Sequence, residues 1–397
     1  MSLLEVITNA LANRENTVTH SEYPIILNSD DILLNLKPNV ENANSAALAN
    51  PVTGWELYQT DSLLIELCKK FHAKLKRRLK DTNNFNKDEF VGILIQFLEK
   101  IAEKVGISIG VDSSDDRYIQ ILIQKVGLLI GWDVAGLVLE VCLDLEIWDL
   151  VETLVINRIV NHSSYSNLIT TLADKNRSDL LCLSVQHASD LGLSELISVL
   201  RYFLCPSKDS LITMVNVREE WERQALFAVE KASDKSLPDK KSHLAKEASI
   251  LLMIAHDGFS VSELCLHYLM ASSNIDDVIL SSAIVKLKGN ETKNLIRYLG
   301  KWLKKYEMFP QAGPCPKAST MLDLKACDWV PKLEDIIRYL GLVLDENFSS
   351  LVLNPGFHEE LVSIESTVTS LASEAKLCCF VSNIIQNLRV QGKGEQT

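Results

Sequence analysis

Proline is scarce in this sequence, and glycine is not abundant. The chain of 397 residues has 10 prolines and 16 glycines, and no proline lies between Pro51 and Pro206. Architectures with many β-turns use both residue types at their turns, so this long stretch argues against a sandwich or barrel. Leu and Ile recur at helical spacing through the same stretch, which favours one helix after another. Because the chain exceeds the usual size of one compact core, we expect either several domains or an elongated helical array.

Motifs of the common enzyme classes are also missing. The sequence has no GxxxxGK[ST], GxGxxG, HExxH or GxSxG, the patterns of phosphate loops, dinucleotide folds, zinc proteases and hydrolase elbows. Cys265 and His267 lack a second ligand pair, and the adjacent Cys378 and Cys379 would point about 100° apart on a helix. We interpret these thiols as core side chains. The sequence predicts no catalytic, cofactor-binding or metal-binding residue, and no small-molecule substrate.

Features of secreted and membrane proteins are equally weak. The N-terminus has neither a basic start nor a sustained apolar run. The most apolar stretch, residues 126–145, contains Asp133, Glu140 and Asp144, which are costly at the centre of a bilayer. The nine cysteines are odd in number and mostly lie among Leu and Val, which is typical of free thiols in a reducing compartment. We expect a nuclear or cytosolic protein without a membrane partner.

What the sequence does contain is helical periodicity. LIRYLGKWLKKY at 295–306 is echoed by IIRYLGLVL at 336–344. On a helical wheel the first copy places six apolar side chains on one face and its basic residues on the other. The second copy places Ile336, Ile337, Leu340, Val343 and Leu344 on its apolar face. Both copies are therefore predicted to be amphipathic helices that pack through one face.

Similar spacing recurs from Asp61 to the C-terminal region. It predicts helices at 61–80, 87–105, 115–130, 133–145, 147–160, 164–174, 178–190, 193–204, 217–232, 242–256, 260–271, 275–287, 291–306, 332–345 and 357–390. Helical pairs of this length fall in the range of α-solenoid repeats, but the self-similarity is weak. We therefore predict an all-α fold, an irregular α-solenoid or helical-hairpin array.

Local composition divides the chain into four parts. Residues 1–60 contain several prolines and a polar, small-residue tract, and are predicted to form an irregular or disordered entry segment. Residues 61–307 form the helical array, 308–330 a proline-containing linker, and 331–397 a C-terminal helical unit with a polar tail. Three helix starts have capping residues at the right spacing: Thr53 with Glu56, Asn86 with Glu89, and Ser260 with Glu263.

The most basic run is KKFHAKLKRRLK at 69–80, with seven Lys or Arg and no acid. A helix here places Leu64, Cys68, Phe71, Leu75 and Leu79 in one stripe. The opposite face, which we call the basic ridge, carries four cations: Lys70, Lys74, Arg77 and Arg78. The ridge could neutralise phosphates of RNA or act as a nuclear import signal, or it could be a solvated helix face. No aromatic residue alternates with the cations in the way that single-strand binding uses.

Other polar and aromatic clusters have simpler interpretations. Residues 126–157 hold six acids and no Lys or Arg, which favours solubility or a basic protein partner. With a net charge of −12, any contact with nucleic acid must be local to the basic ridge. The acids Asp112, Asp115 and Asp116 precede an apolar run, where they suit a helix N-terminus. The tryptophans in helical runs are predicted to be core residues: Trp132, Trp148, Trp221, Trp302 and Trp329.

The C-terminal third shows a series of features in a fixed order. A Leu-rich helix ends in W-L-x-K-Y, a proline-containing spacer follows, and DWVPKLEDIIRYLGLVLDENFSSLVLNPGFHEELVSI begins at Asp328. The last run includes an L-D-x-x-F step at Leu344, Asp345 and Phe348, and a proline before the final long helix. From about residue 278 onward, this order resembles the C-terminal helical region of the nucleolar protein eleven family. The resemblance transfers no catalytic residue.

This resemblance implies a component of the small-subunit processome, in the subcomplex that joins ribosomal DNA transcription to early pre-ribosomal RNA processing. It implies processome proteins as partners and a location in the nucleus, within the nucleolus. Members of that family place a β-propeller ahead of the helical region. This sequence turns helical within about sixty residues, so contacts made through the propeller are not carried over.

The leading hypothesis from the sequence is a non-enzymatic scaffold in ribosome biogenesis. It would hold processome proteins on nascent pre-ribosomal RNA, with the basic ridge as the place where RNA could be touched. The alternative is a cytosolic α-solenoid adaptor that binds other proteins, for instance in trafficking or signalling. A third reading, an enzyme with an unrecognised site, has the least support because no catalytic pattern is present.

Overall fold

The structure is a computed structural model that describes residues 59–80, 85–113, 115, 117–234, 236, 238–310 and 312–394. These residues form one compact unit. All but the last two positions of the predicted entry segment 1–60 lie outside the described residues. So does the predicted cap formed by Thr53 and Glu56.

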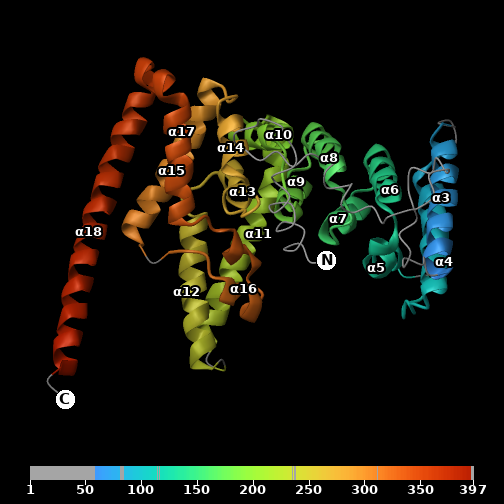
Figure 1. Cartoon of the computed structure of the whole chain (residues 1–397), viewed down its shortest axis with the longest axis horizontal. Coiled ribbons are helices and arrows are strands. Elements are labelled where there is room, and N and C mark those ends of the chain that lie inside the picture. The colour runs from blue at the N-terminus through green and yellow to red at the C-terminus, as the bar shows by residue number, and fades with distance from the viewer. Residues whose placement is uncertain are drawn as a thin grey trace, which may run out of the picture. The chain divides into compact units, whose positions relative to one another are not determined.

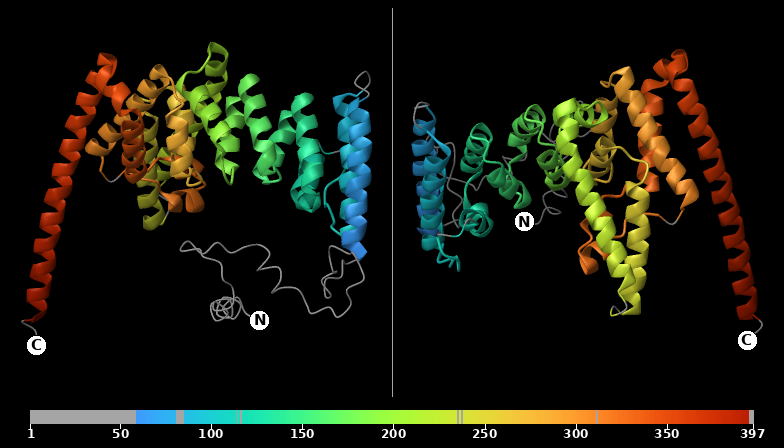
Figure 2. Two further views of the ribbon diagram at one scale, coloured as in Figure 1. Left: turned by 45° about the horizontal axis from the view of Figure 1, so that its top comes forward. Right: turned by 180° about the vertical axis from the view of Figure 1, so that it is seen from behind.

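The all-α prediction is confirmed: the described residues form helices and contain no strand. Figures 1 and 2 show the helices of this unit, coloured from α3 to α18 in chain order. The α-helices are α3 Gln59–Lys80, α4 Lys87–Val105, α5 Tyr118–Val126, α6 Trp132–Asp144, α7 Trp148–Ile156, α8 His162–Asp174, α9 Ser178–His187, α10 Leu193–Leu204, α11 Lys208–Ser233, α12 Asp239–His256, α13 Val261–Met270, α14 Asp277–Ile284, α15 Gly289–Met308, α16 Pro316–Leu322, α17 Leu333–Leu353 and α18 His358–Gly394. Three short 3₁₀ helices are η1 Gly127–Leu129, η2 Lys325–Trp329 and η3 Pro355–Phe357.

Most helices pack on neighbours one or two places along the chain. Thus α4 contacts α3 and α5, α7 contacts α5, α6 and α9, and α8 contacts α6, α9 and α10. α3 also contacts α6, three places along. Farther along, α9 also contacts α13, and α12 contacts α16, so more distant helices meet there. The pairing therefore does not follow one repeated register, and the narrower prediction of an α-solenoid stays a prediction.

Three successive helices, α6, α7 and α8, end in the same turn without using glycine. The turn residues Glu146, Arg158 and Asn176 all have φ near +54°. In the second turn, the N–H of Arg158 donates to the Val155 carbonyl at 3.0 Å, and the next N–H donates to the Leu154 carbonyl at 3.0 Å. This paired hydrogen bonding is the Schellman arrangement, which satisfies carbonyls that the helix end leaves open. It ends each helix sharply, so that the next helix can start within a few residues.

Two of the predicted helix starts are confirmed by their hydrogen bonds. The Asn86 side chain accepts from the Glu89 N–H at 2.9 Å, at the start of α4. Ser260 and Glu263 form a reciprocal capping box at the start of α13. These side chains satisfy backbone N–H groups that have no partner within the helix.

The core of the C-terminal half is aromatic. Trp302 on α15 lies 5.0 Å from both Phe259 and His267, measured between ring centroids. Trp221 of α11 meets the edge of His267 at 5.4 Å, and Tyr298 hydrogen-bonds to its Nδ1. The predicted apolar face of 295–306 is fully buried, which confirms the role of the first echo as a packing face.

The second echo departs from its prediction at one residue. Ile336, Leu340 and Val343 of α17 are buried and Leu344 is partly buried, but Ile337 is 52% exposed. α17 contacts α14, α15 and η3 through a face that is too narrow to include Ile337. The helical wheel predicted the helix correctly, but the buried face that it predicted is wider than the observed one.

The segment predicted as a linker, residues 308–330, contains α16 and η2. The backbone N–H of Ala326 donates to Oε1 of Gln224 on α11 at 2.7 Å, and Leu324, Cys327 and Val330 are buried. Pro316 occupies the first position of α16, where its missing N–H costs nothing. The prolines thus start a short helix that packs against α12 rather than marking a free connection.

Candidate functional site: the basic helix and its groove

The basic run forms most of α3. Asp61 lies in the first turn and Arg77, Arg78 and Lys80 lie in the last, which is the favourable arrangement for the helix dipole. Phe71 stacks on Phe97 of α4 with ring centroids 3.9 Å apart. The apolar stripe of α3 therefore faces α4, and this packing fixes which side chains turn outward.

The structure exposes all four side chains of the basic ridge. Lys70 forms an ion pair with Glu66 at 2.8 Å, and Arg78 approaches Glu89 at 3.5 Å. Lys74 and Arg77 have no ion pair with any residue that the structure describes. Exposed pairs of this kind contribute little to stability, so the ridge is held by the packing of α3 and not by its charges. Its role in binding stays a prediction.

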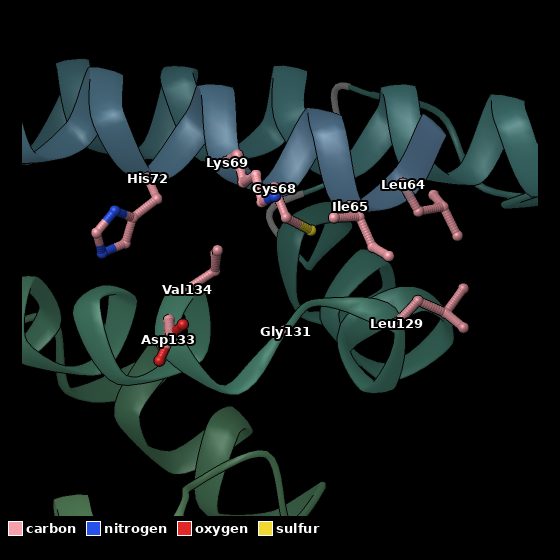
Figure 3. Close-up of a pocket in the computed structure, with 9 residues that line it drawn as sticks. All are labelled: Leu64, Ile65, Cys68, Lys69, His72, Leu129, Gly131, Asp133 and Val134. Atoms are coloured by element: carbon pink, nitrogen blue, oxygen red, sulfur yellow. The ribbon is translucent and has the colours of Figure 1, made fainter. Parts of the chain in front are cut away.

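A groove runs along another side of α3, with a volume of about 340 Å³. One wall comes from α3, and the other comes from η1, the start of α6 and the loop between them, as Figure 3 shows. Its lining residues are Leu64, Ile65, Cys68, Lys69, His72, Leu129, Gly131, Asp133 and Val134. At 100° per residue, Ile65, Lys69 and His72 lie more than 90° around α3 from Lys70 and Lys74. The groove and the basic ridge are thus separate surfaces of one helix.

The groove combines an apolar floor with a few polar groups. Figure 3 shows the His72 ring and the Asp133 carboxylate turned toward the space between the walls, while Ile65 and Leu129 lie at its other end. Such a site can take an apolar side chain and offer hydrogen bonds beside it. A catalytic use would require a nucleophile or base positioned by a third group, and the groove residues show no such chain of hydrogen bonds in the described part. The geometry fits contact with a protein better than chemistry.

Two residues that adjoin the groove lining in sequence carry exposed apolar side chains. Trp132, the first residue of α6, is 60% exposed, and Leu128 in η1 is 76% exposed. The prediction that Trp132 belongs to the core is wrong, because α6 packs through its Val134, Ala135 and Val138 side. By contrast Trp221 and Trp302 are fully buried, as predicted. Exposed Trp and Leu beside a groove are typical of protein-binding surfaces.

Sequence reasoning missed this groove. The signal was present in GLLIGWD at 127–133, where two glycines bracket three apolar residues and a Trp precedes an Asp. The run was interpreted as buried because of its hydropathy alone. Only the break between η1 and α6, at Ile130 and Gly131, turns Leu128 and Trp132 outward.

The acidic stretch keeps its charges on the surface. All six acids of residues 126–157 are exposed. Burial raises the pKa of the Glu152 carboxyl, and the nearby Asp149 and Asp179 raise it further. The acids predicted to start a helix lie before α5 and do not cap it, because α5 has no acid in its first turn and no side-chain cap. Asp115 accepts from the Arg117 N–H at 2.8 Å, and Asp116 lies outside the described residues.

The cysteines are divided between core and surface. Cys142, Cys182, Cys265 and Cys327 are buried, and burial raises the pKa of the Cys142 and Cys327 thiols to about 12. Cys378 and Cys379 are exposed on α18, so their interpretation as core thiols is wrong. Their helix leaves its neighbours before reaching them. No group of three or more His, Cys, Asp or Glu suited to a metal ion occurs among the described residues.

Beyond the groove, one further element stands out by composition. The helical segment Pro355–Gln386 is long and apolar enough to cross a membrane, and α12 with α13 would pass the same test only as a pair bent by 120°. No other described helix does so. The expectation of no membrane partner therefore stays a prediction.

Comparisons of the chain with protein-family models, with curated proteins and with solved structures find no match.

Proposed function

We propose that this protein is a non-enzymatic scaffold of ribosome biogenesis that acts in assembly of the small-subunit processome. In this role it binds processome proteins through helical surfaces, supports pre-ribosomal RNA processing and ribosomal DNA transcription, and works in the nucleolus. The observation that carries the specific assignment is the ordered C-terminal sequence that resembles the nucleolar protein eleven family. The fold is compatible with it because α15, α17 and α18 occupy the matching residues.

The exposed surfaces support the scaffold part of the proposal. The groove of α3 and α6 offers a largely apolar cleft, which suits an amphipathic segment of another protein. Trp132 and Leu128, which adjoin its lining residues in sequence, are exposed. The basic ridge lies on another side of the same helix, with Lys74 and Arg77 unpaired among the described residues. One partner could thus sit in the groove while RNA phosphates meet the ridge.

Depletion of the chain from growing cells tests the proposal. A scaffold of the small-subunit processome should leave precursors of small-subunit ribosomal RNA unprocessed, while the large-subunit RNA is affected less. Re-expression of the wild-type chain should restore processing. If processing is normal after depletion, the proposal fails, and the adaptor in trafficking or signalling becomes the better reading.

A substitution in the groove separates surface function from stability. Ile65→Glu changes a groove-lining side chain that is 45% exposed, so the fold should be retained, and the variant should fail to restore RNA processing. Leu211→Glu, at an exposed apolar position on α11 far along the chain, is the matched control and should restore it. Equal rescue by both variants would remove the groove from the proposal.

A further inference from the structure

The first half of α18 is anchored on α15. Nε of Arg297 lies 2.6 Å from Oε1 of Glu360, and a Cβ built on Gly300 would meet Cγ1 of Ile364 at 3.3 Å. Both pairs advance in the same direction, so the two helices run parallel. Because both helices rise equally per residue, counting eight residues on from Gly300 and from Ile364 places Met308, the last residue of α15, level with residue 372 of α18.

Beyond that level α18 has no described neighbour. Residues 372–386 are all exposed, and Figures 1 and 2 show this half of α18, which we call the extension, running past the end of α15. Large apolar side chains lie along it: Leu377 at 62% exposed and Phe380 at 63% exposed, followed by Val381, Ile384 and Ile385. A solvated helix does not normally present this much apolar surface.

The apolar stripe is confined to the extension. In the part of α18 that packs alongside α15, one helix face carries Ser366, Ser370 and Ser373. The same face continues as Leu377, Val381 and Ile384, at spacings of four and three residues. This is the spacing of a coiled-coil seam, and it begins only where the helix leaves the body. The stripe therefore suits another helix and not a surface of this unit.

A bilayer fits the extension poorly. The uncharged run from Leu377 has twelve residues before Arg389, about 18 Å of helix, whereas a hydrocarbon core is about 30 Å thick. Ser382, Asn383 and Gln386 interrupt the run with polar side chains. The preceding half of the helix is also held to α15 by the Arg297 ion pair.

We propose that the extension pairs with the extension of a second copy of this chain, in an antiparallel helical dimer. Of the residues that flank the seam, Cys378, Phe380 and Ile385 are uncharged. The charged one, Glu374, comes level with position 391 of the other copy, a glutamine, so the antiparallel pair brings no like charges together along the seam. An antiparallel seam sets Val381 of one copy against Ile384 of the other. A two-fold axis then passes between residues 382 and 383, and each copy meets the same surface on its partner.

Charge favours the antiparallel direction over the parallel one. Each chain has a net charge of −12, so two bodies placed side by side would repel. In the antiparallel pair, residue 372 of one copy lies opposite residue 393 of the other. The two bodies then stand at opposite ends of about 30 Å of paired helix, several Debye lengths apart at physiological salt. The C-terminal end of α18 in one copy then lies level with Met308 and Phe309 of the other copy, which are exposed at the end of α15.

Molar mass in solution tests the proposal. The full chain, followed by light scattering across a concentration series, should have the mass of two chains. Leu377→Glu with Ile384→Glu should give the mass of one chain, or at least a tenfold weaker dimer, with an unchanged helical signal because both side chains are exposed in the monomer. Ser366→Glu with Ser370→Glu, on the same face upstream, is the matched control and should remain dimeric.

Cross-linking tests the direction of the pair. In a chain with Cys378→Ser and Cys379→Ser, Val381→Cys should form a disulfide between copies, because position 381 lies close to the two-fold axis. Ser373→Cys should not, because the two copies of position 373 are about 28 Å apart along an antiparallel pair. Overturning results are a wild-type chain that stays monomeric, a dimer that survives Leu377→Glu with Ile384→Glu, cross-linking at position 373, or binding to phosphatidylcholine vesicles in place of dimerisation.

Discussion

His267 is a buried histidine whose hydrogen bonds define its protonation state. Its Nε2 donates to the Ala255 carbonyl at 2.9 Å, because a carbonyl can only accept, and its Nδ1 then accepts from the Tyr298 hydroxyl at 2.9 Å. Burial lowers the pKa of His267 to about 3, against the opposing effect of the hydrogen bond to Ala255 and with a smaller lowering by the nearby His256. The ring is therefore a neutral part of the aromatic core. Its neighbour in sequence, Cys265, was interpreted as a core thiol and is buried.

This residue predicts a pH dependence of folding. Above pH 6.5 the ring is neutral in both states, and the stability is complete. As the pH falls below 6.5, the unfolded chain binds a proton that the folded chain does not, so the free energy of unfolding falls by about 1.4 kcal/mol per pH unit. From pH 7 to pH 5 the His267 contribution is a loss of about 2 kcal/mol, which urea unfolding at the two pH values measures.

The control for this prediction removes the titrating group. His267→Gln should be less stable at pH 7 and should lose about 2 kcal/mol less than wild type between pH 7 and pH 5. Identical pH slopes for His267→Gln and wild type would show that the ring is accessible to protons in the folded state.

Arg158 is held in a backbone conformation that glycine adopts more easily. It has φ of +55° in the turn after α7, and its exposed side chain forms no hydrogen bond or ion pair with the described residues. Arg158→Gly should therefore raise the free energy of unfolding by about 0.5–1 kcal/mol. Thermal or urea unfolding measures the gain. Arg158→Ala keeps the strain and should give no gain; a gain equal to that of glycine would place the effect in the side chain.

At this scale, exposure was the least predictable property. Ile337 and Trp132 were predicted to be buried from their hydrophobicity and helical phase, and both are exposed because the neighbouring helices cover a narrower face. Cys378 was predicted to be buried because it follows Leu377, but the covering helix α15 ends before it. A wheel identifies which side chains share a face, and the position of the next helix decides whether that face is covered.

At the scale of the element, α15 carries the clearest stability prediction. Leu299 is fully buried on its packed face. Leu299→Asp places an unpaired charge in that core and should lower the free energy of unfolding by several kcal/mol. Lys304→Asp introduces the same side chain at an exposed position of the same helix and should change it by less than about 1 kcal/mol. Equal losses in urea unfolding would mean that α15 is not packed as described.

The basic ridge of α3 gives a binding prediction. Lys74→Glu with Arg77→Glu leaves the Lys70 and Arg78 ion pairs in place, so the fold should be retained. At low salt, the variant should bind a single-stranded RNA more weakly than the wild type does. Its slope of log affinity against log salt should be shallower, by the amount expected for the loss of about two phosphate contacts. Fluorescence anisotropy across a salt series measures both. Unchanged binding at low salt would make the ridge a solvated helix face only.

Element boundaries were predictable where local chemistry marks them. The starts of α4 and α13 follow from Asn86 with Glu89 and Ser260 with Glu263, whose caps are local in sequence. The turns after α6, α7 and α8 were harder because Glu146 and Arg158 take a conformation that usually signals glycine. α16 was missed because the prolines around it were interpreted as a linker, while its packing on α12 depends on contacts distant in sequence.

At the scale of the whole molecule, the all-α class follows from the missing prolines and the helical spacing. The sequence does not predict the groove of α3 and α6 or the extension of α18, because each depends on where a neighbouring helix stops. The function proposed here joins a sequence resemblance, confined to the C-terminal third, with surfaces that suit helical partners. In the proposed function these surfaces bind the partners, and the resemblance is the basis for naming the assembly.

Affinity purification of the tagged full-length chain from growing cells tests the central claim most directly. Co-purifying proteins are identified by mass spectrometry, and co-purifying RNA by sequencing, with a strain expressing the tag alone as the control. The account predicts enrichment of early processome proteins together with the precursor of the small-subunit ribosomal RNA. Enrichment of coat, membrane or signalling proteins without any ribosomal precursor would contradict it.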